Sequence, residues 1–182
     1  HMNRTVRLVA ALAATLAATA PAAQGADRDH YVALGDSFTA APFVPMQYGT
    51  PIGCARSDHN YPSVVKAAIG ATVFRDESCS SATTRHMTEP QSVLGGNHIP
   101  QFDALSADAT LVTVGIGGND VGLVGAATDC LGLGLLAPTG TACRSNFAKP
   151  DGGDRLVDKI AAAAPKIAAT LQGIRARSPQ AR

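Results

Sequence analysis

A short apolar run over residues 31–34 ends abruptly in Gly35-Asp36-Ser37, and it constrains the fold more than any other stretch. An apolar run bounded by polar and turn residues predicts a buried strand. Gly-Asp-Ser is then the tight turn at its carboxyl end, where open α/β sheets bind their ligands. A serine there can lie beside the first amides of a following helix, which favour developing negative charge. The same tripeptide is also a common turn sequence, so alone it leaves a turn and a nucleophile as alternatives.

The remaining pattern alternates strands and helices. Residues 71–74 and 109–116 are apolar runs that predict strands, and residues 61–69 predict a helix stopped by Gly70. Residues 154–175 carry a 3.6-residue apolar stripe, although Pro165 inside it predicts a kink or a split. Strands separated by helices indicate β-α-β units. We therefore predict an α/β domain with three α/β/α layers around a parallel sheet.

Three other segments have weaker patterns. Residues 38–59 are rich in glycine, proline and polar residues and predict a long loop. Residues 88–96 predict a short helix or a loop that ends at two glycines, and a short helix is expected to begin near Asp120. Residues 131–140 are apolar and glycine-rich, and we expect them to line a substrate site.

Composition narrows the class of protein. The chain has 182 residues, 46% of them hydrophobic and 16% charged, which fits one globular domain. The net charge of +1 gives no electrostatic reason to expect nucleic acid as a partner. No Cys-x-x-Cys or Cys/His spacing indicates zinc. We expect a monomer without metal or organic cofactor.

Residues 1–26 have the pattern of a signal peptide that follows a cloning scar at His1 and Met2. Arg4 and Arg7 precede an apolar, alanine-rich stretch over residues 8–20, and small residues follow it. That stretch is shorter than the roughly 20 residues that span a bilayer. We therefore expect a secreted protein without a stable membrane anchor, whose domain occupies residues 27–182.

Export also gives the four cysteines a role. Secreted domains use cysteine pairs as structural disulfides. The four are Cys54, Cys79, Cys130 and Cys143, and they allow three connectivities that their spacing alone does not separate.

Polar residues follow three of the predicted strands. Ser37 follows the first, Ser80 and Ser81 follow the second, and Asn119 follows the third. In a parallel sheet these strand ends share one edge, so the residues can meet there. Acyl transfer needs a nucleophile and donors aimed at the developing oxyanion. Ser37 can attack, and the Ser37 and Ser81 amides and the Asn119 carboxamide can donate. Asn119 after two glycines is also an ordinary turn residue.

The segments 35–37, 79–83 and 117–120, in this order, resemble the first three blocks of the SGNH (GDSL) hydrolases. The resemblance is closest to secreted actinobacterial lipases and esterases. It implies a flavodoxin-like fold, Ser37 as the nucleophile and Asn119 as an oxyanion-hole donor. Glycine is usual in this family where the chain has Ser81, whose backbone amide can still donate. The resemblance also implies the sequential disulfides, Cys54 with Cys79 and Cys130 with Cys143.

The general base of that family comes from a fourth block, an Asp-x-x-His near the carboxyl terminus, and this chain has no such block after Asn119. We therefore expect the chain to be the amino-terminal portion of a longer enzyme, with a sheet that is incomplete at its carboxyl end. Asp27 and His30 have the required spacing, but they precede the first strand, at the opposite end of the sheet from Ser37. The loop histidines are His59, His86 and His98, of which His86 is the nearest to the site in sequence and a weak substitute.

The sequence therefore predicts a secreted serine esterase or lipase that forms an acyl-enzyme on Ser37. Lipid or short-chain acyl esters are the expected substrates. Two alternatives stay open: a carbohydrate deacetylase of the same fold, and a non-catalytic secreted binding protein with a degenerate hydrolase site.

Overall fold

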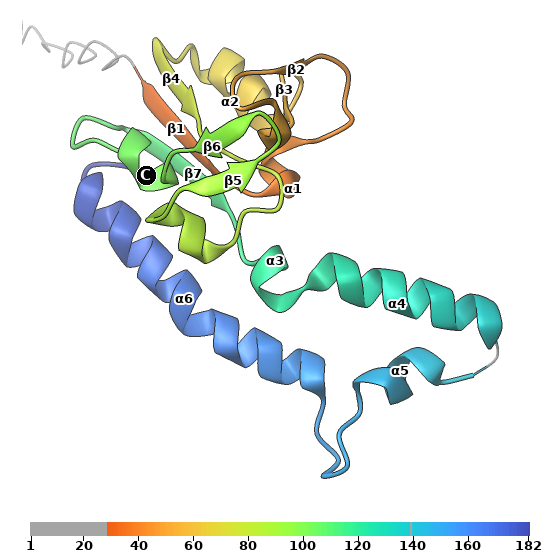
Figure 1. Ribbon diagram of the computed structural model, residues 1–182. Coiled ribbons are helices and arrows are strands. Elements are labelled where there is room, and N and C mark those ends of the chain that lie inside the picture. The colour runs from red at the N-terminus through yellow and green to blue at the C-terminus, as the bar shows by residue number, and fades with distance from the viewer. Residues whose placement is uncertain (1–28, 139) are drawn as a thin grey trace, which may run out of the picture.

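The computed structural model describes residues 29–138 and 140–182 (Figure 1). The signal peptide predicted at residues 1–26 lies outside the described residues, as do residues 27 and 28 of the predicted domain.

The centre of the molecule is a parallel sheet of three strands. Its order is β4 (Val73–Asp76), β1 (His30–Gly35) and β7 (Leu111–Gly115), and both pairings are parallel. The predicted α/β class and parallel sheet are therefore confirmed. The second strand begins and ends two residues later than its apolar run predicts, because Val73 is the residue that pairs with His30 at the start of β1.

Alternation along the strands divides the sheet into two faces. Val32 and Leu34 are fully buried on one face, in a cluster that also holds Met87 of η2 (Thr84–Met87) and Phe102 of η3 (Gln101–Ala104). Helix α6 (Arg155–Arg177) packs against this cluster through Ile174. Successive side chains of a strand point to opposite faces of the sheet. Tyr31 accordingly lies on the other face, where its ring contacts that of Phe74.

Helix α2 (Tyr61–Ile69) covers that second face and matches its predicted bounds. The Asn60 side chain caps it by accepting a hydrogen bond from the Ser63 amide, and Gly70 ends it in the left-handed conformation. The Tyr61 hydroxyl donates to Thr113 Oγ1 at 3.2 Å, which ties the helix to β7 across the sheet.

Two segments differ from their predictions. The long loop predicted at 38–59 contains helix α1 (Ser37–Ala40), η1 (Ile52–Cys54) and a small antiparallel pair, β2 (Gln47–Tyr48) with β3 (Arg56–Ser57). The helix considered for residues 88–96 is wrong. A hairpin forms there instead, from β5 (Gln91–Val93) and β6 (Gly96–His98), because Gly95 and Gly96 at positive φ turn the chain back on itself.

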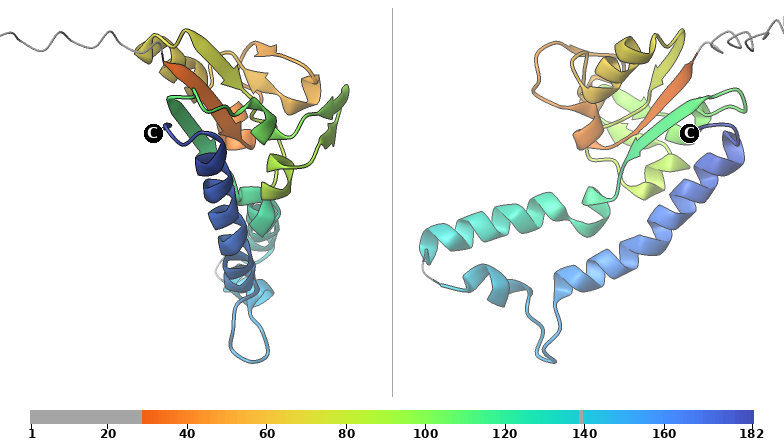
Figure 2. Two further views of the ribbon diagram at one scale, coloured as in Figure 1. Left: turned by 90° about the vertical axis from the view of Figure 1, so that its left-hand side faces the viewer. Right: turned by 180° about the vertical axis from the view of Figure 1, so that it is seen from behind.

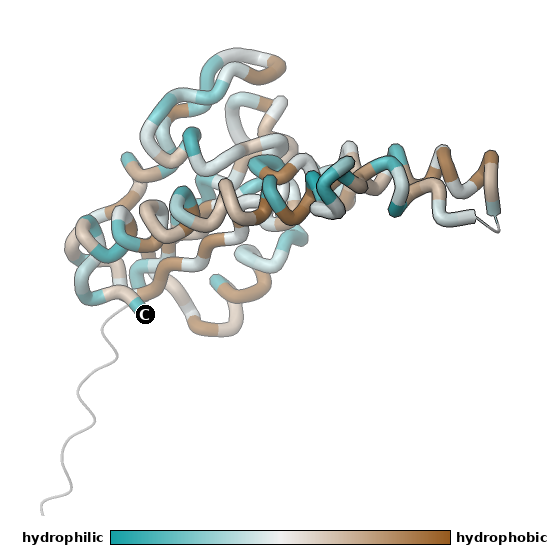
Figure 3. Tube along the Cα trace, turned by 90° about the horizontal axis from the view of Figure 1, so that it is seen from below, coloured by the Kyte–Doolittle hydropathy of each residue, from teal (hydrophilic) through white to brown (hydrophobic). Residues whose placement is uncertain are grey.

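An arm extends away from the sheet in every ribbon view (Figures 1 and 2). It consists of α4 (Leu123–Leu136), α5 (Ala142–Phe147) and the beginning of α6, and it leaves the sheet through α3 (Gly118–Val121). Hydrophobic residues recur along it (Figure 3). Leu131 is 70% exposed and Leu135 86% exposed. These two leucines face solvent on the arm, and the place of residues 131–140 at a substrate site stays a prediction.

Helix α6 runs unbroken through Pro165, so the predicted split does not occur. Proline leaves the carbonyl four residues earlier without its helical donor. Ala161 and Pro165 are both exposed, so water can satisfy that carbonyl. None of the helices in the described part of the chain is long and apolar enough to cross a membrane.

Gly173 lets α6 approach the core closely. A Cβ atom there would lie 2.5 Å from Cε2 of Phe102, whose ring is also covered by the Arg177 guanidinium. We predict that Gly173→Ala destabilises the protein by ~1 kcal/mol, because overpacking outweighs the gain in helix propensity.

The matched control is Gly132→Ala in α4, where no atom lies within 4 Å of the added methyl group. That change is expected to stabilise by ~0.5–1 kcal/mol. Urea unfolding of both variants measures the difference, and a stabilised Gly173→Ala variant would contradict the close packing of α6 on Phe102.

Candidate active site

Ser37 lies at the carboxyl end of the central strand, as the first residue of α1. Asp36 caps this four-residue helix, and its carboxylate accepts a hydrogen bond from the Phe38 amide at 3.0 Å. Gly35 has φ +152°, and a side chain there would collide with Thr39 Oγ1 and with the carbonyl of Gly115. Only glycine therefore allows the turn that presents Ser37.

The topology places Ser37 at a switch point. From β1 the chain passes to β4 on one side, and it later returns to β7 on the other side. The strand order reverses beside β1, and α/β sheets bind ligands at the carboxyl ends of the strands where this reversal occurs. Ser37 is therefore at the position where the fold alone predicts a binding site.

The second block is hydrogen-bonded to the same strand end. The Cys79 amide donates to the carbonyl of Gly35 at 3.0 Å, and the Ser80 amide donates to the carbonyl of Cys54 at 3.0 Å. Ser81 follows with φ +66°, in the left-handed region that favours glycine, and its side chain is exposed. Its conformation is therefore the one expected of the glycine that is usual in the SGNH hydrolases at this position.

The third block faces both others. A Cβ atom on Gly118 would lie 3.6 Å from the Asp36 carboxylate and 3.9 Å from the Phe38 ring, so Gly118 packs beside the residues on either side of Ser37. Asn119 Nδ2 donates to the carbonyl of Ala82, the residue after Ser81, at 2.8 Å. A carboxamide nitrogen carries two hydrogens. Asn119 can therefore hold the second block with one hydrogen and keep the other for a further acceptor.

The predicted pairing of the cysteines agrees with the structure. Cys54 is bonded to Cys79, beside the second block, and Cys130 is bonded to Cys143, between α4 and α5. In the described residues, the one grouping of three potential metal ligands is Cys54, Cys79 and His98. Both of its sulfur atoms are taken up by the disulfide, so this grouping does not offer a metal site.

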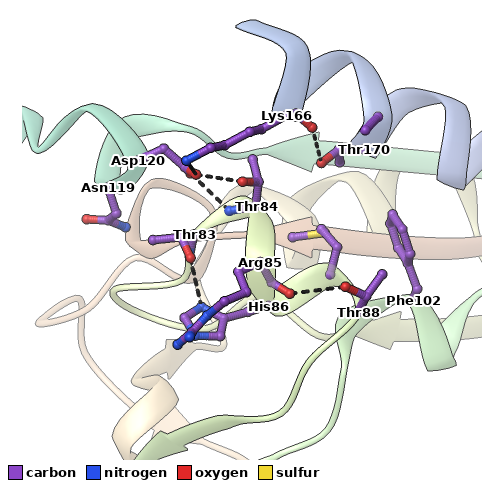
Figure 4. A pocket seen from close by; sticks show the side chains of 12 residues that line it. Thr83, Thr84, Arg85, His86, Thr88, Phe102, Asn119, Asp120, Lys166 and Thr170 are labelled. Atoms are coloured by element: carbon purple, nitrogen blue, oxygen red, sulfur yellow. Dashed lines mark hydrogen bonds and ion pairs between the residues drawn. The ribbon is translucent and has the colours of Figure 1, made fainter. Parts of the chain in front are cut away.

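Hydrogen bonds that sequence reasoning missed join Thr84, the residue directly after the second block, to Asp120 of the third block. The Asp120 carboxylate accepts from the Thr84 amide at 2.9 Å and from the Thr84 hydroxyl at 2.5 Å, and Lys166 Nζ lies 4.0 Å away (Figure 4). Thr84, Asp120 and Lys166 line a pocket of about 710 Å³, which Asn119 also lines. The only sequence signal of these hydrogen bonds was the acidic residue directly after Asn119.

The Asp36 and Asp120 side chains are both buried. Burial is the main cause that raises the pKa of the Asp36 carboxyl, the Phe38 amide lowers it, and the negative charge of Asp120 raises it again. The carboxyl group of Asp36 is therefore harder to ionise than that of an ordinary aspartate.

None of the four described histidines is hydrogen-bonded to Ser37. His30 lies at the opposite end of β1, 3.4 Å from Asp108, and His59 is exposed beside Asp58. His98 is buried against Glu77 and Arg56.

His86 lines the pocket with Asn119, but its Nδ1 accepts from the Thr83 amide at 3.0 Å. Burial, followed by the charge of Arg85, lowers the pKa of His86, which favours the neutral ring with its proton on Nε2. His86 thus belongs to the pocket wall, and no contact joins it to the Ser37 hydroxyl.

The fold defines an α/β protein with a candidate serine nucleophile at the switch point of its sheet. Residues 33–182 match the GDSL-like lipase/acylhydrolase family, and the chain belongs to that family. The resemblance predicted from the three sequence blocks is therefore confirmed.

Relatives from Streptomyces agree with this assignment. Lipase 2 of Streptomyces coelicolor is 37% identical over 187 residues, which cover 100% of this chain and 60% of that lipase. The crystal structure of an extracellular lipase from Streptomyces rimosus is similar with a TM-score of 0.65 and 25% identity, over 85% of this chain and 57% of the lipase. The fold also resembles phospholipase A1 from Streptomyces albidoflavus, with a TM-score of 0.59 and 21% identity, over 85% of this chain and 57% of the phospholipase. This chain thus spans about three fifths of the length of these relatives.

Because Ser81 has a left-handed backbone conformation, replacing it with glycine tests whether the backbone there is strained. Ser81→Gly removes a Cβ atom that costs about 1–2 kcal/mol in this region, against an unfolded-chain entropy cost of ~0.5–1 kcal/mol. We predict a net stabilisation of ~0.5–1 kcal/mol in urea unfolding.

Ser81→Ala is the control, because it removes the hydroxyl and keeps Cβ. It is expected to change stability by less than ~0.5 kcal/mol. Equal stabilisation by both changes would show that the hydroxyl, rather than the backbone conformation, is unfavourable.

Proposed function

We propose that the protein hydrolyses carboxylic esters through an acyl-enzyme on Ser37. The observation that carries this proposal is that the three segments are joined beside Ser37: the Cys79 amide donates to the Gly35 carbonyl, Asn119 donates to the Ala82 carbonyl, and Gly118 packs beside Asp36. A nucleophile flanked by hydrogen-bond donors is the arrangement that acyl transfer requires.

The chemistry follows in two stages. Ser37 Oγ attacks the ester carbonyl carbon while a general base takes its proton, and the carbonyl oxygen becomes an oxyanion. The backbone amides of Ser37 and Ser81 and Nδ2 of Asn119 are the donors that would stabilise this charge. The tetrahedral intermediate then expels the alcohol, which receives the proton. Water attacks the acyl-enzyme in the same way and releases the carboxylic acid.

Lipid or short-chain acyl esters are the proposed substrates. Apolar side chains lie exposed just after the nucleophile, with Phe38 71%, Phe43 98% and Met46 70% exposed. Such a surface favours an apolar acyl chain over a sugar. The lipase names of the relatives support the same substrate class.

We also propose that the protein acts outside the cell as a monomer. The signal-peptide pattern, the two disulfides and the extracellular relative from Streptomyces rimosus support secretion. The net charge of +1 gives no electrostatic support for nucleic acid as a partner.

Fluorophosphonate labelling of the complete natural protein tests the mechanism. We predict covalent labelling that Ser37→Ala abolishes, measured by intact mass. Asn119→Ala is expected to lower kcat on p-nitrophenyl esters by about 10²–10³-fold, because one oxyanion donor is lost.

Asn97→Ala, on the exposed hairpin strand β6, is the matched control and is expected to leave kcat unchanged. Rates on p-nitrophenyl esters of increasing acyl length, compared with acetylated sugars, separate an esterase from a carbohydrate deacetylase. A folded protein that is not labelled and hydrolyses neither class would instead be a non-catalytic binding protein.

A further inference from the structure

The pairing between β1 and the chain that continues from β4 is regular on the carbonyl side as far as Gly35, but not on the amide side. The Glu77 amide still donates to the carbonyl of Ala33 at 2.9 Å, as a parallel pairing requires. At Gly35, two residues further along β1, the strand amide has no partner in the backbone after β4. A side chain takes that place. The Gly35 amide donates to Gln101 Oε1 at 2.8 Å, and Gln101 Nε2 donates to the carbonyl of Gly35 at 2.9 Å.

The side-chain oxygen of Gln101 therefore takes the place of the peptide carbonyl that a regular ladder would offer to the Gly35 amide. Its Nε2 adds a further donor to the Gly35 carbonyl. The carbonyl of Gly35 also receives the Cys79 amide at 3.0 Å, so this single oxygen holds both Gln101 and the second block. Ser37 follows Gly35 by two residues, and Ser81 follows Cys79 by two residues.

Gln101 is itself held firmly. Its side chain is completely buried, and it begins η3, whose Phe102 and Ala104 belong to the core cluster beneath β1. Helix α6 packs on Phe102 through Gly173. The carboxamide thus projects from a packed element that neither block contributes.

We propose that Gln101 is a positioning residue, which fixes the Ser37 turn relative to the Ser81 amide by pairing with Gly35. This inference rests on the proposed function and deepens it. Gln101 bonds Gly35, two residues before Ser37, so it acts through Gly35. Its loss is expected to misplace the nucleophile and the oxyanion donor with respect to each other, and a misplacement of about 1 Å can cost about 10²-fold in rate.

Two substitutions separate positioning from mere packing. Gln101→Leu removes both hydrogen bonds while keeping most of the volume. Gln101→Glu keeps the acceptor, and it regains the donor when the carboxyl group is protonated, because a carboxylic acid offers one O–H and one C=O. Burial raises the pKa of a carboxyl group. The protonated form, which mimics the native carboxamide, becomes more populated as the pH falls.

The experiment measures the second-order rate of fluorophosphonate labelling, together with kcat and KM, in the complete natural protein between acidic and neutral pH. We expect Gln101→Leu to lower the labelling rate and kcat by about 10-fold or more, with a much smaller change in KM. The rate of Gln101→Glu relative to the unchanged protein is expected to rise as the pH falls, whereas the ratio for Gln101→Leu stays flat.

Ile174→Ala is the control for general destabilisation, because Ile174 packs against the same core cluster without a polar link to Gly35. It is expected to lower the unfolding temperature and to label at the unchanged rate. A folded Gln101→Leu variant that labels at the unchanged rate would overturn the proposal.

If Gln101→Leu does not fold, the pH dependence of Gln101→Glu decides, and a flat ratio would overturn the proposal. If the unchanged protein is not labelled at Ser37, the proposed function fails instead. The two failures are therefore distinguishable.

Discussion

The backbone of Gly35 is the point on which the candidate site depends. Its amide pairs with Gln101, and its carbonyl accepts from both Gln101 and Cys79. One residue later, the Asp36 amide donates to the carbonyl of Gly115 at the end of β7. The nucleophile turn is thus tied to segments on both sides of β1. Because buried backbone groups must be paired, these bonds leave the turn little freedom to move.

Local patterns in the sequence predicted a large part of this arrangement. A strand that ends in Gly-Asp-Ser, the helix α2 between Asn60 and Gly70, and the apolar stripe of α6 are each visible within a few residues. The meeting of the segments around Ser37, Ser81 and Asn119 followed from one further step, because the ends of parallel strands share an edge. The roles of these three residues remain predictions.

Long-range polar contacts could not be predicted in the same way. Gln101 and Gly35 are 66 residues apart, and Thr84 and Asp120 are 36 apart. A glutamine or a threonine in a loop has no pattern that names its partner. The position of the apolar segment after Asp120 could not be predicted for a related reason. Its composition does not show that Leu131 and Leu135 lie on an arm and are exposed to solvent.

The distance in sequence between Gly35 and its partners also governs the order of assembly. The Gly35 carbonyl is complete only when residues 79 and 101 have both been brought to it, and each closure costs chain entropy before it gains a contact. A growing or partly folded chain therefore carries Ser37 before residues 79 and 101 lie beside its turn. Under the function that we propose, ester hydrolysis would begin only after these contacts have formed.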